Sequence, residues 1–517
     1  MSVNTKGKTG GKLSKKGLSA GSVGLLGAVV IGISCIAPAY TLTGALGPTV
    51  SQVGAQVPAI FLVGFIPMLL VAFGYRELNK AMPDSGTSFT WGTRAFGPWI
   101  GWMSGWGLVV ATVVVLSNLA GIAVEFFYLL LSQLFNNPAI ADLSRNTLVN
   151  VVTCLIFMAI ATTVSYRDMQ TTQRIQYWLV GFQLIVFLGF GATALVRAYN
   201  GTAVHATPVQ LDWFNPLATS SFAAFTAGVS LSLFVYWGWD VTLTMNEETT
   251  DSGRTPGRAA ITTVVVIVSI YLFVTVGSMA FAGLGDTGIG LGNPDIQENV
   301  FFALSGPVLG PLAMLMSLAI LSSSAASLQS TFVSPARTLL AMGHYGALPK
   351  KFATISPRFY TPSYATLVSA LGASIFYAFM RVVSEKVLWD TVETLGAMIC
   401  FYYGLTAFAA VWYFRRQWFN SVRDFFFKLA APGIGGLTLL ILLVMTLRES
   451  IDPDYGSGSQ LFGLGLVFVL TLVLILSGVV IMIISYFRNP DFFRGATISK
   501  SEANLDEEAV PVLNLDA

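Results

Sequence analysis

Twelve apolar runs, each long enough to cross a lipid bilayer, dominate this sequence. A transmembrane helix needs roughly 20 such residues, because each residue adds about 1.5 Å to its length. Of the 517 residues, 54% are hydrophobic and only 10% are charged, which excludes an ordinary soluble domain. We therefore predict an all-α integral membrane protein with twelve transmembrane helices, over residues 22–46, 56–79, 97–131, 145–165, 172–197, 219–245, 259–284, 307–341, 362–381, 389–414, 429–448 and 461–487.

The positions of lysine and arginine predict the orientation of these helices. With the N-terminus inside, 23 of the 28 basic residues fall in inner segments and five in outer ones. Basic residues favour the cytoplasmic side of a membrane, so both termini are expected there. The basic head "KGKTGGKLSKK" could begin a signal peptide, but no polar cleavage region follows the first apolar run. We interpret that run as a retained helix.

The first and the sixth predicted helices contain residues that interrupt a helix. Pro38, in "GISCIAPAYTLTGALG", lacks a backbone N–H and suits the first turn of a new helix. In "LSLFVYWGWD", Gly238 weakens the helix, and Asp240 is suited to cap a helix that restarts after it. Each break alone could be an ordinary kink. Together they favour irregular backbone lining a cavity, because lipid offers no hydrogen bonds to such backbone.

The two breaks lie in the first helix of two successive five-helix blocks. An odd number of helices inverts the second block relative to the first, as in secondary transporters that bind substrate between broken helices. The predicted organisation is a basic cytoplasmic tail over 1–21, a transport core over 22–414 formed by the repeats 22–197 and 219–414, two extra helices over 415–487, and a cytoplasmic C-terminal tail over 488–517.

Five local patterns follow one another between about Gly21 and Lys428. They are "IAPAYTLTG", "PDSGTSFTWGTRAFGPWIGWMSGW", "YWGWDVTLTMNEE", "TPGRA" and "SPARTLLAMGHYGALPKKF". In their order and spacing the chain resembles permeases of the amino acid-polyamine-organocation superfamily. The resemblance implies amino acid transport through a fold of two inverted five-helix repeats with broken helices 1 and 6. Where some members carry a lysine in the fifth helix, this chain has Gln183, which leaves the driving ion open.

A zwitterionic amino acid needs partners for its carboxylate and its ammonium group. Freed N–H groups where the first helix restarts would bind the carboxylate, because a helix N-terminus carries partial positive charge. Freed carbonyls at both breaks would bind the ammonium. By resemblance, Phe234 is expected to be an aromatic gate, while Trp237 and Trp239 would shape the pocket or simply pack between helices. The predicted substrate-binding residues are Ile33, Ser34, Ala37, Ala39, Tyr40, Phe234, Val235, Tyr236 and Trp237.

Asp240 is the predicted coupling residue. An ionisable group within a membrane helix costs about 2.5–3.5 kcal/mol on insertion scales, so it marks a functional site. It would accept a proton or bind an ammonium group; a pure helix cap is the alternative. Glu247 and Glu248 are expected to pair with loop arginines. The serines of "LSSSAASLQS" are expected to let helices pack closely, with a sodium site as the alternative.

The predicted function is secondary active transport of amino acids across the cytoplasmic membrane, proton-coupled or by exchange. The alternatives are a polyamine importer, a channel or a nutrient sensor. The chain has two histidines, both in predicted loops, and neither an HExxH motif nor a phosphate-binding glycine loop, so we expect no enzyme, no metal and no cofactor. The expected partners are the substrate, membrane lipids and a coupling ion, a proton rather than sodium, and no nucleic acid.

Overall fold

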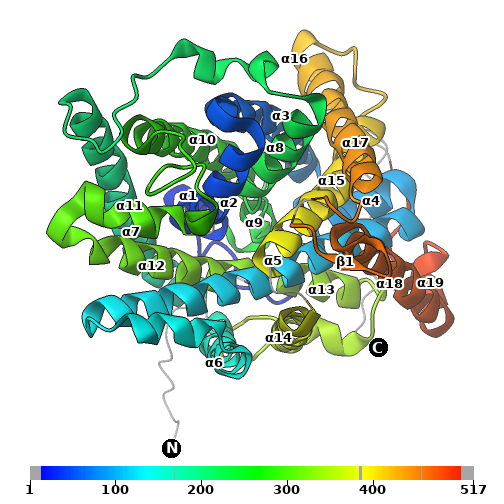
Figure 1. Ribbon diagram of the computed structural model, residues 1–517. Helices are drawn as coiled ribbons and strands as arrows, with labels where there is room; N and C mark the ends of the chain where they lie inside the picture. Colours follow the sequence, from blue (N-terminus) through cyan, green and yellow to red (C-terminus); the bar gives the residue numbers. More distant parts are fainter. Residues whose placement is uncertain (1–12, 168, 298, 384–386, 456, 502–517) are drawn as a thin grey trace, which may run out of the picture.

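The computed structural model describes residues 13–501 except 168, 298, 384–386 and 456. Residues 1–12 and 502–517, which make up most of the two predicted tails, lie outside the described residues. The chain is a bundle of helices with one small hairpin formed by β1 (Gln460–Leu461) and β2 (Leu464–Gly465) (Figure 1). The helices are α1 (Leu25–Ile36), α2 (Pro38–Val53), α3 (Val57–Ala81), α4 (Ser88–Phe96), α5 (Pro98–Leu134), α6 (Thr147–Ser165), α7 (Met169–Tyr199), α8 (Phe222–Val235), α9 (Val241–Thr244), α10 (Thr255–Ala282), α11 (Val300–Leu309), α12 (Met314–Thr331), α13 (Val333–His344), α14 (Ser363–Val383), α15 (Val387–Tyr413), α16 (Val422–Asp424), α17 (Ala431–Glu449), α18 (Leu466–Arg488) and α19 (Pro490–Phe493).

Nine helical stretches in the described part of the chain are long and apolar enough to cross a membrane. This confirms the predicted all-helical membrane protein. The count of twelve stays a prediction, as does the inverted repeat. The first two predicted spans form one stretch, Leu25–Ala81, and the predicted sixth and eighth spans are divided into shorter helices.

The long helices differ in how deeply they are buried. In α5, 94% of the most apolar window is buried within the protein, whereas in α18 the share is 22%. Large apolar side chains are exposed on the outer helices, among them Leu148, Trp178 and Phe487. Such side chains are at home against lipid, so the outer helices are suited to face the bilayer while α5 and its neighbours form the centre.

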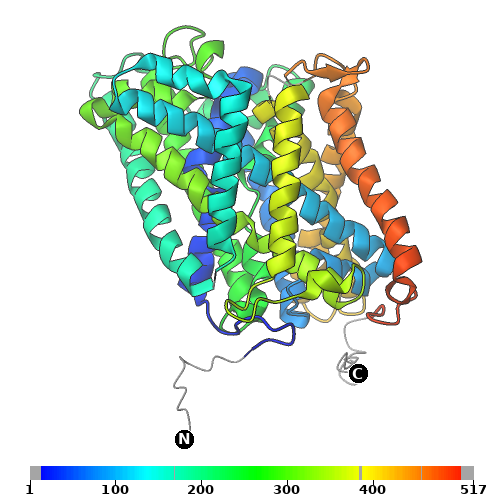
Figure 2. The same cartoon turned by 90° about the horizontal axis from the view of Figure 1, so that it is seen from below.

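Both ends of the described chain lie on one face of the bundle, the lower face in Figure 2. We call this the terminal face. Ser501 donates its backbone N–H to the carbonyl oxygen of Arg94, which attaches the C-terminal segment to the end of α4. Residues 1–12 and 502–517 lie beyond these described ends, so the side of the membrane on which the two termini lie stays a prediction.

Candidate functional site

The first predicted break lies one residue before the proline. Ala37 adopts a left-handed conformation with φ 55°, ends α1 and donates its N–H to the carbonyl of Ile33 over 2.9 Å. Pro38 then occupies the first position of α2, where its missing N–H costs nothing. The restart of a helix at Pro38 is thus confirmed. The carbonyl of Ile33 is a predicted partner for the substrate ammonium group, and in the structure it already accepts the N–H of Ala37.

The second break separates α8 from the short α9. Gly238 has φ 110°, a conformation that residues with a side chain rarely adopt. An added Cβ atom there would lie 3.1 Å from Sγ of Cys35 and 3.2 Å from its carbonyl carbon. The two interrupted helices therefore touch at their breaks, and glycine permits this close approach.

A small cavity lies beside the two breaks. Two predicted site residues line it: the rings of Tyr40 and Phe234 meet edge to face with centroids 6.5 Å apart. The complete lining is Tyr40, Gly44, Pro48, Asn118, Ile122, Leu231, Phe234, Trp389 and Val392. The lining residues come from four helices that are far apart in the sequence, α2, α5, α8 and α15.

Other predicted site residues are engaged in contacts between helices. Tyr236 donates its hydroxyl to the carbonyl of Phe61 over 2.8 Å, which turns its ring toward α3. Trp237 donates its indole N–H to the hydroxyl of Tyr402 over 2.7 Å. Ala37, Ala39 and Val235 are fully buried. None of these residues lines the cavity, and whether the substrate reaches their backbone groups stays a prediction.

Asp240 is buried, and two tyrosines of α15 hold its carboxylate. The hydroxyl of Tyr403 donates to Oδ1 over 2.9 Å and that of Tyr402 to Oδ2 over 3.3 Å. Tyr75 and Trp239 pack around Tyr403, with ring centroids 5.6 and 5.0 Å from it. Within the described residues the Asp240 side chain forms no capping bond to α9. The expectation that it caps the restarted helix is therefore wrong, because the hydroxyl donors of α15 engage its oxygens.

Hydroxyl groups of α12 bind both sides of the first break. Ser327 donates to the carbonyl of Cys35 over 2.7 Å, and Ser323 accepts the backbone N–H of Tyr40 over 3.2 Å. This confirms that the serine cluster joins helices. Ser323 therefore binds one of the N–H groups predicted to bind the substrate carboxylate. The sequence pattern did not indicate this contact.

A glutamine of α7 bridges α1 and α12 next to the first break. Gln176 accepts a hydrogen bond from the Ser34 hydroxyl, and its Nε2 donates to the carbonyl of Ala326 and to Oε1 of Gln329, each over 3.0 Å. Gln183 lies two turns further along α7, fully buried, and among the described residues its amide has no hydrogen-bond partner. The α7 side chain that reaches α1 is therefore Gln176. That Gln183 stands where some permeases carry a lysine stays a prediction.

The two glutamates after α9 bind different cations. Glu248 forms a buried pair with Arg337 of α13, with distances of 2.8 and 3.0 Å, as expected for pairing with an arginine. Glu247 instead contacts the ammonium group of Lys16, from the segment before α1, over 2.5 Å. The expectation of an arginine partner for Glu247 is wrong, because Lys16 lies against Glu247 at the terminal face.

Proteins named as transporters are similar to this chain over most of its length. The model of the amino acid permease family matches residues 23–470. The low-affinity putrescine importer PlaP of Escherichia coli K12 is 22% identical over 430 residues, which are 82% of this chain and 88% of that protein. The methylthioribose transporter of Bacillus subtilis is 23% identical over 68% of this chain and 73% of its own. The branched-chain amino acid permease BcaP of Lactococcus lactis is 23% identical over 62% of this chain and 67% of its own.

These relatives differ in the molecule that their names give, so similarity alone does not select a substrate. Their names agree in describing an importer, a transporter or a permease, and the matching family is one of transporters and not of enzymes. With the family model spanning most of the sequence and both breaks included in it, the chain belongs to the amino acid permease family of the amino acid-polyamine-organocation superfamily.

Proposed function

We propose that the protein takes up amino acids across the cytoplasmic membrane by alternating access, with the terminal face toward the cytoplasm. The observation that carries this proposal is the contact between two broken helices beside a cavity lined by Tyr40 and Phe234. Broken helices supply N–H groups for a carboxylate and carbonyl groups for an ammonium, which are the two groups that all α-amino acids share. We expect the backbone N–H groups of Ala39 and Tyr40, at the start of α2, to bind the carboxylate, which for Tyr40 requires its N–H to leave Ser323.

The cavity lining favours a substrate with an apolar side chain. Its walls are largely aliphatic or aromatic, with Ile122, Leu231, Trp389 and Val392 among them, and none of its nine residues is charged. Burying a neutral polar group there without a hydrogen-bond partner would cost at least roughly 2 kcal/mol, and burying an unpaired charge would cost several kcal/mol or more. An aliphatic side chain would instead gain free energy by leaving water. We therefore infer an amino acid such as leucine or valine.

A putrescine importer is the second candidate. It is favoured by the similarity to PlaP, which extends over 82% of this chain, and by the buried carboxylate of Asp240. Asp240, however, is bonded to two tyrosine hydroxyls and is not part of the cavity lining. None of the nine lining residues is an anion that could bind an end of a diamine, although the buried carboxylate of Glu393 accepts the indole N–H of the lining residue Trp389 over 2.8 Å. We therefore place this candidate after an apolar amino acid.

The substrate class is tested with purified protein in proteoliposomes. We expect labelled leucine or valine to accumulate under an imposed proton gradient, and unlabelled leucine to compete. Labelled putrescine is expected neither to enter nor to compete. Uptake of putrescine without uptake of any amino acid in the panel would overturn the proposed substrate and support the second candidate.

Replacing Phe234 by alanine is expected to impair transport more than folding. The ring lines the cavity and packs on Tyr40, so its loss removes apolar contact with the substrate. We expect kcat/KM to fall roughly 10- to 100-fold, since burying a phenylalanine side chain contributes about 1.5–3 kcal/mol. Initial uptake rates over a range of substrate concentrations measure this effect.

The matched control is Phe222→Ala, on the same helix. Phe222 is 68% exposed and does not line the cavity, so transport by this variant should stay close to that of the parent protein. Size-exclusion profiles verify that both variants fold. Unchanged kinetics in a well-folded Phe234→Ala variant would remove Phe234 from the site.

A further inference from the structure

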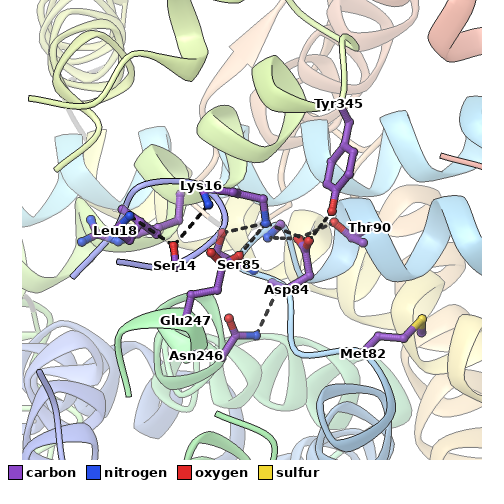
Figure 3. A network of polar contacts seen from close by, with 12 residues as sticks. Ser14, Lys16, Leu18, Met82, Asp84, Ser85, Thr90, Asn246, Glu247 and Tyr345 are labelled. Atoms are coloured by element: carbon purple, nitrogen blue, oxygen red, sulfur yellow. Dashed lines mark hydrogen bonds and ion pairs between the residues drawn. The ribbon is translucent and has the colours of Figure 1, made fainter. Parts of the chain in front are cut away.

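A lysine from the segment before α1 is buried at the terminal face. The Lys16 side chain is 3% exposed, and its ammonium lies 2.7 Å from Oδ2 of Asp84, 2.5 Å from Oε1 of Glu247 and 3.3 Å from Oγ of Ser85 (Figure 3). The chain around it folds tightly, with Ser14 accepting the backbone N–H of Leu18. Lysine is rarely buried unless it is paired, so this arrangement is a specific attachment of the segment to the bundle.

The ammonium group joins segments that belong to different parts of the core. Asp84 lies in the loop between α3 and α4, and Glu247 follows α9, the inner half of the second broken helix. Asp84 also accepts the hydroxyl of Tyr345, which follows α13, over 2.6 Å, and the hydroxyl of Thr90 over 2.8 Å (Figure 3). Lys16 is thus the cation at the centre of a network that reaches four segments.

Backbone hydrogen bonds next to this network tie the two broken helices directly. Val23, just before α1, donates its N–H to the carbonyl of Glu248 over 3.0 Å, and its own carbonyl accepts the N–H of Thr250 over 2.9 Å. Separating the terminal-face end of α1 from that of α9 therefore requires both a short strand-like pairing and the lysine network to break.

The charges of the network are stable around neutral pH. Burial alone would lower the pKa of Lys16, but the adjacent Asp84 and Glu247 outweigh burial and raise that pKa. Burial alone would raise the pKa of Asp84, yet Lys16 and the hydrogen bonds it receives lower it to about 2. Both shifts favour the charged forms of Lys16 and Asp84 around neutral pH.

We propose that Lys16 is a latch that closes the cytoplasmic side of the transport pathway, by holding the inner ends of α1 and α9 to the α3–α4 loop. The proposal rests on the proposed alternating access and on the cytoplasmic orientation of the terminal face. Opening toward the cytoplasm then requires the ammonium to leave Asp84 and Glu247. A ligand-free protein with an intact latch keeps this side shut.

The test measures access to the space behind the latch, and it needs no substrate. Thr244 is the last residue of α9, about one turn before Glu247; it is fully buried, and its hydroxyl contacts that of Ser334 in α13. With Cys35, Cys154 and Cys400 replaced by alanine, Thr244→Cys becomes a single reporter for a charged, membrane-impermeant thiol reagent added at the terminal face. In the latched protein this cysteine should react slowly.

Adding Lys16→Gln to the reporter protein is expected to speed labelling at least about tenfold, because removing one partner of a buried ion pair leaves the others uncompensated. Lys15→Ala is the matched control: Lys15 is adjacent but exposed, so labelling should stay at the parent rate. Glu247→Gln, which keeps the shape of the side chain and removes one anion, should give an intermediate rate and decides the matter if Lys16→Gln does not fold.

Labelling rates of Lys16→Gln and Glu247→Gln that equal the rate of Lys15→Ala would overturn the latch. Because the readout uses no substrate, such a result would leave the proposed amino acid transport standing. Conversely, failure to transport any amino acid would leave the labelling test valid. In the wild-type background, Lys16→Gln should also weaken the apparent affinity for external substrate, since fewer molecules face outward.

Discussion

Replacing Asp240 by asparagine is expected to abolish uphill, proton-driven uptake while exchange of substrate across the membrane continues. The buried carboxylate accepts hydroxyl hydrogen bonds from Tyr402 and Tyr403 of α15 and lies directly before α9, so a change in its protonation would alter the contact between the second broken helix and α15. Asparagine keeps the size of the side chain and one acceptor oxygen but cannot titrate. Ionisable groups inside membrane helices commonly serve as proton relays.

The measurement compares accumulation and exchange in the same proteoliposomes. An inward gradient of about one pH unit can support about tenfold accumulation by one-to-one proton symport, since a factor of ten corresponds to about 1.4 kcal/mol. We expect this accumulation to vanish in Asp240→Asn and to persist in the control Asp295→Asn, an exposed position. If Asp240→Asn still concentrates substrate on a proton gradient, Asp240 has a structural role and the coupling proposal fails.

Replacing Gly238 by alanine is expected to inactivate the protein by forcing the two breaks apart. The φ of 110° is strained for any residue with a side chain, at a cost of about 1–3 kcal/mol. The added methyl group would also meet the backbone and Sγ of Cys35 at 3.1–3.3 Å. A thermal melt followed by size exclusion should show a loss of several degrees, and uptake should fall below a tenth of the parent rate, since about 1.4 kcal/mol is a factor of ten.

The control for this prediction is Gly189→Ala in α7. Gly189 is helical and exposed, and an added Cβ atom there meets no atom within 4 Å. Alanine also has a higher helix propensity than glycine, so this variant should be at least as stable as the parent protein. Normal uptake by Gly238→Ala would show that the close contact between the breaks is dispensable.

Local patterns were enough to predict where the helices break. Pro38 cannot continue a hydrogen-bonded turn, and the structure starts α2 at this residue. The residue with the left-handed backbone conformation, however, is Ala37, and an alanine side chain does not favour that conformation. The length of the apolar runs predicted the membrane helices themselves. Nine stretches in the described part of the chain are long and apolar enough to cross a membrane, because the first two predicted spans form one stretch and the sixth and eighth are divided into shorter helices.

The partners of the candidate site residues could not be predicted, because they lie far away in the sequence. Asp240 was recognised from its charge, yet its donors Tyr402 and Tyr403 follow more than 160 residues later. Tyr40 likewise has partners that are distant in the sequence. Ser323 of α12 accepts its backbone N–H, and Asn118 of α5 accepts its hydroxyl and donates to Thr391. A polar residue in an apolar helix is expected to have a hydrogen-bond partner, but which residue that is depends on the fold.

The central claim is that the substrate binds between the two broken helices, at the cavity lined by Tyr40 and Phe234. A cryo-EM structure of the protein in nanodiscs, with the transported amino acid at saturating concentration, tests it most directly. The account predicts density for the carboxylate next to the backbone of Ala39 and Tyr40, with the side chain against Phe234. Substrate density elsewhere in the bundle, with these two breaks empty, would contradict it.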